Sequence, residues 1–237
     1  MLVKTKAIVL NAIKYQDKNL IVKCFTQSDG IKTYMVYNVF SSKKVNQKAA
    51  YFQALTILEI EAVHKNKNTL ETLKEVRLAI PFTTINTNVY KSTIVIFLSE
   101  ILHYSIQEQE KNEALFYYLE TALQWLDHHN ETANFHLILM LEITKFLGFY
   151  PDISQSDLLH FDITEGRFLN LQSITSISLH ETQLFKKLLL LKFDHDQKTF
   201  SGSERSSLLK VLLNYYTTHL SGFKKPKSLD VLTAVFS

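Results

Sequence analysis

The first eighty residues alternate between apolar and polar positions with a period of two, which is typical of β-strands. Five runs carry this pattern, at residues 6–10, 19–26, 31–37, 54–63 and 70–78. Asp29 and Gly30 lie between the second and third runs, and this pair favours a tight hairpin turn because glycine adopts positive φ at little cost. Short strands with no long helix between them predict a small closed barrel over residues 1–80.

From Pro81 onward the apolar period changes to 3.6, which is the period of a helix. This pattern predicts helices at residues 88–107, 113–128, 133–147, 179–191 and 203–220. Asn112 is a suitable N-cap, and Gly148 and Gly222 are suitable stops. An alternating segment with a turn at Glu165 and Gly166 predicts a small hairpin near residues 159–170. The expected fold class is therefore α+β, with a barrel domain at 1–80 and a mostly helical domain at 81–237.

The composition is that of an ordered globular protein, with 237 residues of which 46% are hydrophobic. Its one cysteine, Cys24, allows no internal disulfide and no multi-cysteine zinc site, and we expect a small buried side chain there. The start of the chain lacks the long apolar core of a signal peptide, and no apolar stretch reaches the length of a membrane span. We therefore expect a soluble, reduced, cytoplasmic protein that does not bind membranes.

Positive charge is concentrated in the predicted barrel. Residues 1–80 contain 13 Lys or Arg against 6 Asp or Glu, whereas the rest of the chain contains 13 basic and 17 acidic residues. Such an asymmetry suggests a polyanionic partner for the N-terminal part. A lysine-rich solvated surface explains the same numbers equally well, so charge alone leaves both interpretations open.

Basic and aromatic residues alternate along the predicted barrel. Phosphate binding needs cations along a groove, and base stacking needs aromatic faces beside them, so this pattern suits single-stranded nucleic acid. Ordinary cross-strand packing of the tyrosine and plain solvation of the lysines are the structural alternatives. The candidate DNA-binding residues are Lys14, Lys18, Lys32, Tyr34, Lys43, Lys44 and Lys48, with Tyr15 lying among them.

The sequence carries little that indicates catalysis. No glycine-rich phosphate loop, nucleophile elbow or His-Glu-x-x-His motif is present. Asp194, His195 and Asp196 could hold a metal for a hydrolase, although a polar loop between helices is the plainer interpretation. We therefore expect a protein that is not an enzyme and needs no cofactor.

The C-terminal segment places three lysines beside an apolar cluster. Lys224, Lys225 and Lys227 precede Leu229 and Leu232. Such a segment can bind an acidic, hydrophobic peptide tail of a partner protein. The alternative is that it closes the helical core beside a solvated loop.

Several of these elements, taken in order, resemble the RecO family. The chain begins with an apolar strand at 6–10, a Tyr-x-Asp turn at 15–17, a second apolar strand, Phe-Thr at 25–26 and the turn at Gly30. Later it carries Leu-Gly-Phe-Tyr-Pro at 147–151, Phe-Asp-Ile-Thr-Glu-Gly-Arg-Phe at 161–168 and Lys-Pro-Lys-Ser-Leu-Asp-Val-Leu at 225–232. The resemblance spans the whole chain.

This resemblance implies an N-terminal OB-fold, a helical C-terminal domain and a role as a recombination mediator in DNA repair. It implies binding to single- and double-stranded DNA, annealing of complementary strands and loading of recombinase onto DNA covered by single-strand-binding protein. The expected partners are a RecR-type protein and the acidic C-terminal tail of the single-strand-binding protein. The rival hypothesis is a protein-interaction adaptor whose barrel never touches nucleic acid.

The sequence departs from the family pattern in two places. Many members carry four cysteines before the hairpin, where they bind zinc, but residues 153–160 contain none. We therefore predict no metal there, with the hairpin held by packing of Phe161, Ile163 and Phe168. The glycine- and arginine-rich loop that usually follows the third strand is replaced by residues 38–44, whose only cations are Lys43 and Lys44. Bidentate phosphate contacts, which need arginine, are therefore less available to this loop.

Overall fold

One long bent strand organises the N-terminal part of the chain. In the computed structural model β1 (Leu2–Tyr15) pairs with β4 (Ile57–Val63) through its first half and with β2 (Asn19–Thr26) through its second half. The register with β2 shifts between Val9 and Asn11, which inserts an extra residue into the ladder. An insertion of this kind bends a strand and increases its twist, so β1 can belong to both sides of a barrel.

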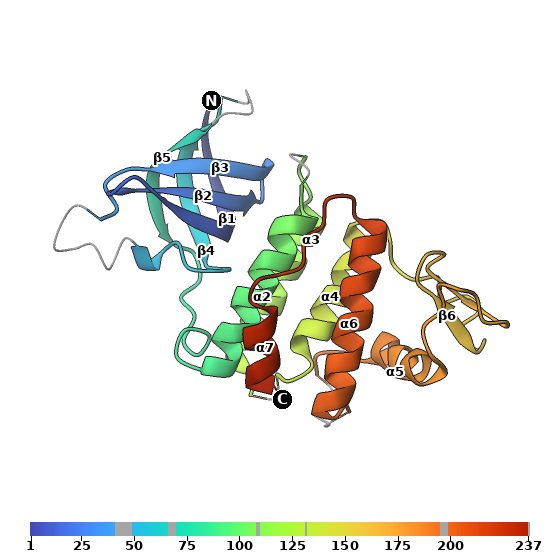
Figure 1. The fold of residues 1–237 in the computed structure, drawn as a ribbon. Helices are drawn as coiled ribbons and strands as arrows, with labels where there is room; N and C mark the ends of the chain where they lie inside the picture. Colours follow the sequence, from blue (N-terminus) through green and yellow to red (C-terminus); the bar gives the residue numbers. More distant parts are fainter. Residues whose placement is uncertain (41–48, 66–69, 108–109, 131, 195–198, 237) are drawn as a thin grey trace. The chain divides into compact units, whose positions relative to one another are not determined.

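The barrel closes through two further strands. β3 (Gly30–Val36) and β5 (Glu71–Leu78) form a parallel pair at Tyr34 and Glu71, and the closed order is β1-β2-β3-β5-β4 (Figure 1). This arrangement is that of an OB-fold and confirms the predicted barrel. The sequence pattern had indicated only residues 6–10 for the first strand, because the exposed ends of β1 do not alternate.

The structure describes residues 1–40, 49–65, 70–107, 110–130, 132–194 and 199–236, and it packs as two units, 1–128 and 129–237. The boundary predicted at residue 80 falls inside the first unit, between the barrel and α2 (Val89–Ser105). α2 contacts β1, and α3 (Glu113–His128) is joined to β1 by an ion pair of 2.7 Å between Lys6 and Glu120. Lys23 of β2 donates to the carbonyl of His103 in α2 at 2.9 Å.

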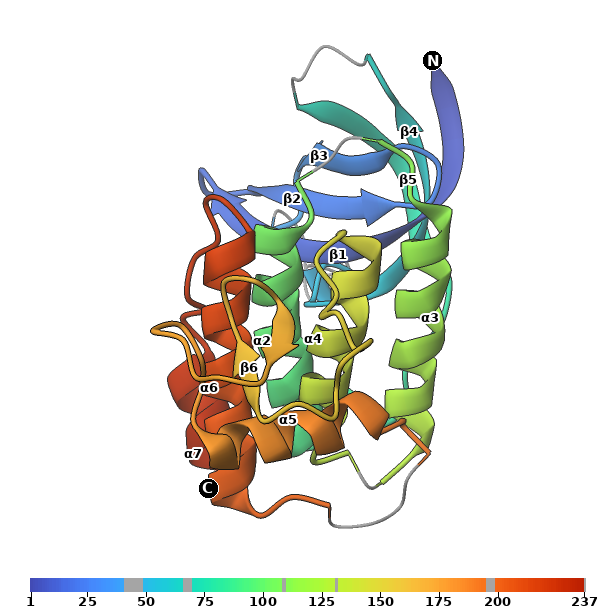
Figure 2. The ribbon, with the colours of Figure 1, turned by 90° about the vertical axis from the view of Figure 1, so that its right-hand side faces the viewer.

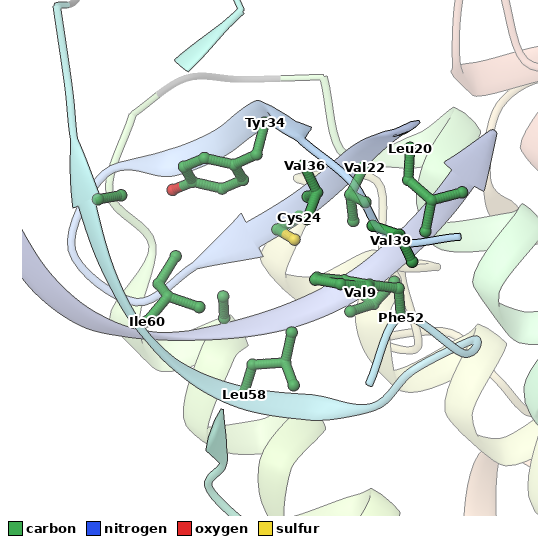
Figure 3. Packing of buried hydrophobic residues seen from close by; sticks show 12 residues of the cluster. Val9, Leu20, Val22, Cys24, Tyr34, Val36, Val39, Phe52, Leu58 and Ile60 are labelled. Carbon is green, nitrogen blue, oxygen red and sulfur yellow. The ribbon is translucent and has the colours of Figure 1, made fainter. Parts of the chain in front are cut away.

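The barrel interior is apolar (Figure 3). Its buried cluster is formed mainly by Val9, Leu20, Val22, Cys24, Tyr34, Val36, Val39, Phe52, Leu58 and Ile60. Cys24 is 2% exposed, and burial raises the pKa of its thiol to about 12. The thiol therefore stays protonated at neutral pH, which confirms the predicted role of a small core residue and leaves no thiolate for catalysis.

A single carboxylate fastens the chain where it leaves the barrel. Asp127, near the end of α3, accepts hydrogen bonds from the backbone N–H groups of Thr83, Thr84 and Ile85 at distances of 2.8–3.1 Å. The ammonium of Lys91, which is 1% exposed, donates to the carbonyl of Asp127 at 2.9 Å and to the Thr84 hydroxyl at 2.6 Å. These bonds supply acceptors and donors to a turn that would otherwise bury unsatisfied polar groups.

The described residues of the second unit form four helices and a hairpin. The helices are α4 (Phe135–Phe146), α5 (Leu179–Leu190), α6 (Gly202–His219) and α7 (Leu229–Phe236), and the hairpin is β6 (His160–Asp162) with β7 (Arg167–Leu169). The predicted helices and hairpin are confirmed. α7 was missed, because its eight residues are too few to establish a helical period.

The hairpin packs against α5 and α6 (Figure 2). The ring of Phe161 lies 5.0 Å from Phe168, 4.6 Å from Phe185 of α5 and 5.8 Å from Tyr215 of α6. Ile163 is 5% exposed, so the predicted packing through Phe161, Ile163 and Phe168 is confirmed.

In the part of the chain that the structure describes, no helix is long and apolar enough to cross a bilayer.

Replacing Asp127 with Ala should lower the free energy of unfolding by about 3 kcal/mol, because several backbone donors lose their only strong acceptor. Urea denaturation at pH 7 measures this loss. Asp157→Ala is a matched control, since Asp157 is an exposed carboxylate. Equal stability of the two variants would show that the turn does not depend on Asp127.

The same clamp should weaken in acid. Burial alone would raise the pKa of Asp127, but the N–H groups of Thr83, Ile85 and Thr84 lower it from 3.8 to about 2. A carboxyl whose pKa is lower in the folded chain stabilises the fold above its unfolded pKa, and this contribution is lost as pH falls towards the folded value. The difference in stability between the wild type and Asp127→Ala should therefore shrink between about pH 4 and pH 2.

Candidate nucleic-acid interface

Two of the candidate lysines lie together at one end of the barrel. Lys14 is near the end of β1, Lys18 is in the turn to β2, and both side chains are exposed. Phe40, which follows β3, donates its N–H to the Lys18 carbonyl at 3.3 Å, and its ring lies 5.8 Å from the Lys14 ammonium. Neither ammonium has a carboxylate partner among the described residues. This end of the barrel therefore presents two lysines that have no ion-pair partner in the described part of the chain, beside the exposed Asp17 of the same turn.

Two exposed tyrosines lie at the same end. Tyr15 is 42% exposed and pairs with Asn19, whose side-chain oxygen accepts the N–H of Asn38 at 3.1 Å. Tyr37, directly after β3, is 58% exposed, and Ile13 is 56% exposed. Alternate residues of a strand share a face, so Ile13 and Tyr15 lie on one outer face of the barrel. Aromatic rings next to lysines provide the elements of a stacking surface for unpaired bases.

The prediction of Tyr34 as a stacking platform is wrong. Tyr34 is 1% exposed, and its ring lies inside the barrel with Cys24 and Val36 (Figure 3). Its hydroxyl forms a hydrogen bond of 2.8 Å with Nε2 of His64. The inward face of β3 therefore carries Tyr34 and Val36, and Tyr37 is exposed. This is the reverse of the prediction, which placed Tyr34 on the surface.

His64 fixes this buried tyrosine. Its Nδ1 lies 3.3 Å from the carboxylate of Asp29, and its ring is 5.8 Å from the ring of Tyr34. Burial lowers the pKa of His64, while Asp29 opposes this effect. Burial also raises the pKa of Tyr34, so the hydroxyl stays protonated and available for the bond. The pair is structural, because neither side chain reaches the surface.

The remaining candidate lysines do not join Lys14 and Lys18 among the described residues. Lys32 lies on the same face of β3 as Tyr34 and is half-buried. It lies five residues before Tyr37, about 17 Å along a strand. The structure therefore does not bring Lys32 together with Lys14 and Lys18. Lys43, Lys44 and Lys48 lie outside the described residues.

On another side of the barrel, cations are paired with carboxylates. A shallow groove there is lined by Lys4, Glu59, Ile60, Glu61, Glu75, Val76 and Arg77. Arg77 donates to Glu59 at 2.7 and 3.1 Å, and Lys4 lies 3.2 Å from Glu61. Glu61 also pairs across the strands with Glu75. Because Arg77 and Lys4 are paired with carboxylates, they are less available to a phosphate backbone.

The C-terminal lysines lie on the segment between α6 and α7. Lys224, Lys225 and Lys227 are exposed, whereas Phe223 and Pro226 are buried. Phe223 packs 5.3 Å from the ring of Tyr216 in α6. The apolar residues of this segment therefore close the helical core, and the lysines face solvent.

The candidate residues for hydrolysis form no site in the described part of the chain. His195 and Asp196 lie outside the described residues, and Asp194 is the last residue before them. Among the residues that are described, no group of three or more His, Cys, Asp and Glu side chains could hold a metal ion.

Sequence reasoning missed Tyr37 and Phe40. Both faces of β3 carry large apolar residues, so alternation could not tell which face points inward. Tyr15 and Tyr37 belong to two different hairpins, β1–β2 and β2–β3, so no single turn in the sequence relates them. Pairing of β3 with β5, which no local pattern reveals, decides the face.

Two family models match the chain, described as Recombination protein O N terminal over residues 1–82 and Recombination protein O C terminal over residues 87–230. A curated relative from Flavobacterium johnsoniae is 63% identical over 237 residues, and one from Flavobacterium psychrophilum is 65% identical over 238 residues. A third, from Christiangramia forsetii, is 42% identical over 238 residues. Each comparison covers 100% of both chains, and each relative is named DNA repair protein RecO.

Two tyrosine variants distinguish the surface from the core. Tyr34→Phe should lower the free energy of unfolding by about 1–3 kcal/mol, because it removes the partner of buried His64. Tyr37→Ala should leave stability within about 0.5 kcal/mol of the wild type, because the side chain is exposed. Tyr37→Ala should instead weaken binding of an unstructured oligonucleotide by about 1–3 kcal/mol, while Tyr34→Phe should not.

Urea denaturation and fluorescence anisotropy measure the two effects. Unchanged oligonucleotide affinity of Tyr37→Ala, with a loss for Tyr34→Phe beyond its loss of folded fraction, would contradict this placement of the stacking surface.

Proposed function

Because the chain belongs to the RecO family of DNA repair proteins, we propose that it is a non-catalytic recombination mediator whose barrel binds DNA at the β1–β2 end. The observation that carries the proposal is the meeting of Lys14, Lys18, Tyr15 and Tyr37 at this end, opposite a groove rich in carboxylates. Single-stranded and double-stranded DNA would both bind, since the phosphate backbone is common to them.

The chemistry of this surface favours binding without sequence readout. Lysine offers a point charge to phosphate, and tyrosine offers a face to any base. Arg77 and Lys4 are engaged with carboxylates on the other side of the barrel, so they contribute little. Hydrogen bonding to base edges is not required, which leaves those edges available to pair with another strand.

Annealing follows from the same features. Two strands repel each other through their phosphates, and exposed lysines reduce this repulsion when both strands are held near one surface. Bases that stack on tyrosine keep their pairing edges open. We propose that this surface brings complementary strands together and that a RecR-type protein and the tail of the single-strand-binding protein act as partners in loading recombinase.

The C-terminal lysines suit the acidic tail of the single-strand-binding protein. Lys224, Lys225 and Lys227 are exposed within four residues of one another, and an acidic peptide tail is the ligand that such a cluster attracts. Since Phe223 and Pro226 are buried, the lysines would provide attraction and an apolar contact would come from elsewhere on the second unit.

A charge variant tests the DNA-binding surface. Lys14→Ala combined with Lys18→Ala should lower affinity for single-stranded DNA about 10-fold near 0.1 M salt, and should reduce the slope of log K against log salt by about 1.4. Anisotropy titrations at two or more salt concentrations measure both quantities. A barrel that acts only as a protein adaptor would bind no oligonucleotide at any of them.

The matched control removes the same charge from the other side. Lys4 and Lys74 are exposed on β1 and β5, so Lys4→Ala with Lys74→Ala changes net charge equally. This control variant should leave the slope of log K against log salt near the wild-type value. Equal losses for both double variants would mean that net charge, and not the β1–β2 end, determines binding.

A second experiment tests the C-terminal lysines. Replacing Lys224, Lys225 and Lys227 together with Ala should slow annealing of DNA covered by intact single-strand-binding protein, because attraction to the tail is lost. The variant should anneal bare strands at the wild-type rate. Annealing is followed by fluorescence quenching with intact and with tail-deleted single-strand-binding protein. A defect that persists without the tail would contradict the assignment.

A further inference from the structure

A loop in the second unit exposes two large aliphatic side chains. Leu171 is 81% exposed and Ile174 is 103% exposed, and both lie between β7 and α5. Single exposed hydrophobic residues are common on protein surfaces and carry no meaning alone. This pair differs because the loop that carries it is tightly held.

A buried carboxylate holds the loop. Asp162, which is 1% exposed, accepts hydrogen bonds from the hydroxyls of Ser173 and Thr175, the residues on each side of Ile174. The N–H of Glu165 donates to the same carboxylate at 2.8 Å. Burial opposes ionisation, but these bonds lower the pKa of Asp162, so it stays charged at neutral pH. Ile174 therefore lies between two anchored residues.

Backbone bonds complete this fixation. Ile163 donates its N–H to the carbonyl of Thr175 at 3.2 Å, and Ile177 donates to the carbonyl of Phe161 at 3.0 Å. The N–H of Ser173 donates to the hydroxyl of Ser176 at 3.0 Å. These bonds attach the loop to the hairpin, and Ile174 lies between the attached residues. Fixing an exposed residue in this way reduces the entropy lost when a partner binds it.

The charge of the region restricts the partner. Residues 152–181 contain five acidic residues, Asp152, Asp157, Asp162, Glu165 and Glu181, and one basic residue, Arg167. Lys186 and Lys187 follow on α5, and the Lys186 ammonium donates to the Leu158 carbonyl at 2.6 Å and lies 5.4 Å from the Phe168 ring. Residues 152–190 therefore hold five acidic and three basic residues, so the region stays net negative. This negative charge would repel DNA, and it would repel the same region of a second copy of the chain.

We propose that the loop at residues 171–176 is a docking knob that inserts Leu171 and Ile174 into an apolar pocket with a basic rim on a partner protein. A few side chains buried in desolvated pockets supply most of the binding energy in such contacts, and the surrounding charges fix the orientation. The knob is separate from the barrel surface, so the chain would bind DNA and this partner with different residues.

Two aspartate substitutions test the proposal. Leu171→Asp and Ile174→Asp should each weaken binding of the partner about 10-fold or more, because a charge cannot enter an apolar pocket. Leu190→Asp is the matched control, since Leu190 is 79% exposed and lies at the end of α5. The probes are the purified RecR-type protein and the recombinase of the same organism, a choice that rests on the proposed function.

Isothermal titration calorimetry with the full chain measures affinity, and thermal unfolding verifies that each variant folds. The proposal is supported if at least one probe loses affinity for Leu171→Asp and Ile174→Asp but not for Leu190→Asp. It is overturned if neither probe binds the wild type, or if all three variants bind like the wild type or lose affinity equally.

DNA affinity of the same variants separates this proposal from the proposed function. Both knob variants should bind single-stranded DNA like the wild type, because the substituted residues lie outside the barrel. Absence of DNA binding by the wild type would contradict the proposed function and leave the knob intact. Ser173→Ala provides a further arm: it keeps both anchors but removes a bond to Asp162, so affinity should fall several-fold through loss of order.

Discussion

The bend of β1 is the constraint on which the rest of the barrel depends. One strand of 14 residues pairs with β4 from Leu2 to Ile8 and with β2 from Ala7 to Tyr15, with a shift in the second register between Val9 and Asn11. Because of the bend, the two ends of β1 lie on different sides of the barrel. Lys4 joins the carboxylates of β4 and β5, whereas Lys14 and Tyr15 reach the hairpin end, where no carboxylate among the described residues pairs with Lys14. A straight strand would have placed these lysines on one continuous face. The electrostatic polarity of the barrel thus follows from its geometry.

Local sequence signals predicted much of this fold. Asp29 and Gly30 marked a real hairpin turn, and Gly148, with φ of +81°, ends α4 as expected. The inward face of β3 was not predictable, because both of its faces are apolar and pairing with β5 decides between them. The same reason explains the exchange of Tyr34 for Tyr37 in the candidate site. Lysine positions could be read from the sequence, but whether a carboxylate lies opposite each lysine could not.

Two lone carboxylates carry more of the structure than their sequence context indicates. Asp127 binds backbone groups more than forty residues earlier, and Asp162 binds hydroxyls more than ten residues later. Local sequence does not reveal the role of either residue, since any Asp in a helix or hairpin has the same local appearance. Their partners are mostly ordinary Thr and Ser residues, whose N–H and hydroxyl groups come within hydrogen-bonding distance of these carboxylates only after folding. Such long-range clamps are invisible to periodicity because they depend on contacts between elements.

The two clamps differ in what they hold, and this difference has a functional consequence. Asp127 secures a turn whose neighbour Ile85 is buried, so its bonds serve stability directly. Asp162 secures a loop whose central side chain, Ile174, contacts solvent, so the order of that loop adds no apolar burial to the fold. Stability alone does not require a fixed conformation for a fully exposed aliphatic residue. Ordering such a residue is useful when a second surface covers it, because the entropy of fixing the loop is then lost during folding and not during association. The proposed DNA-binding end of the barrel and the proposed knob at 171–176 would be two recognition surfaces of opposite charge on one chain, and each would repel the ligand of the other.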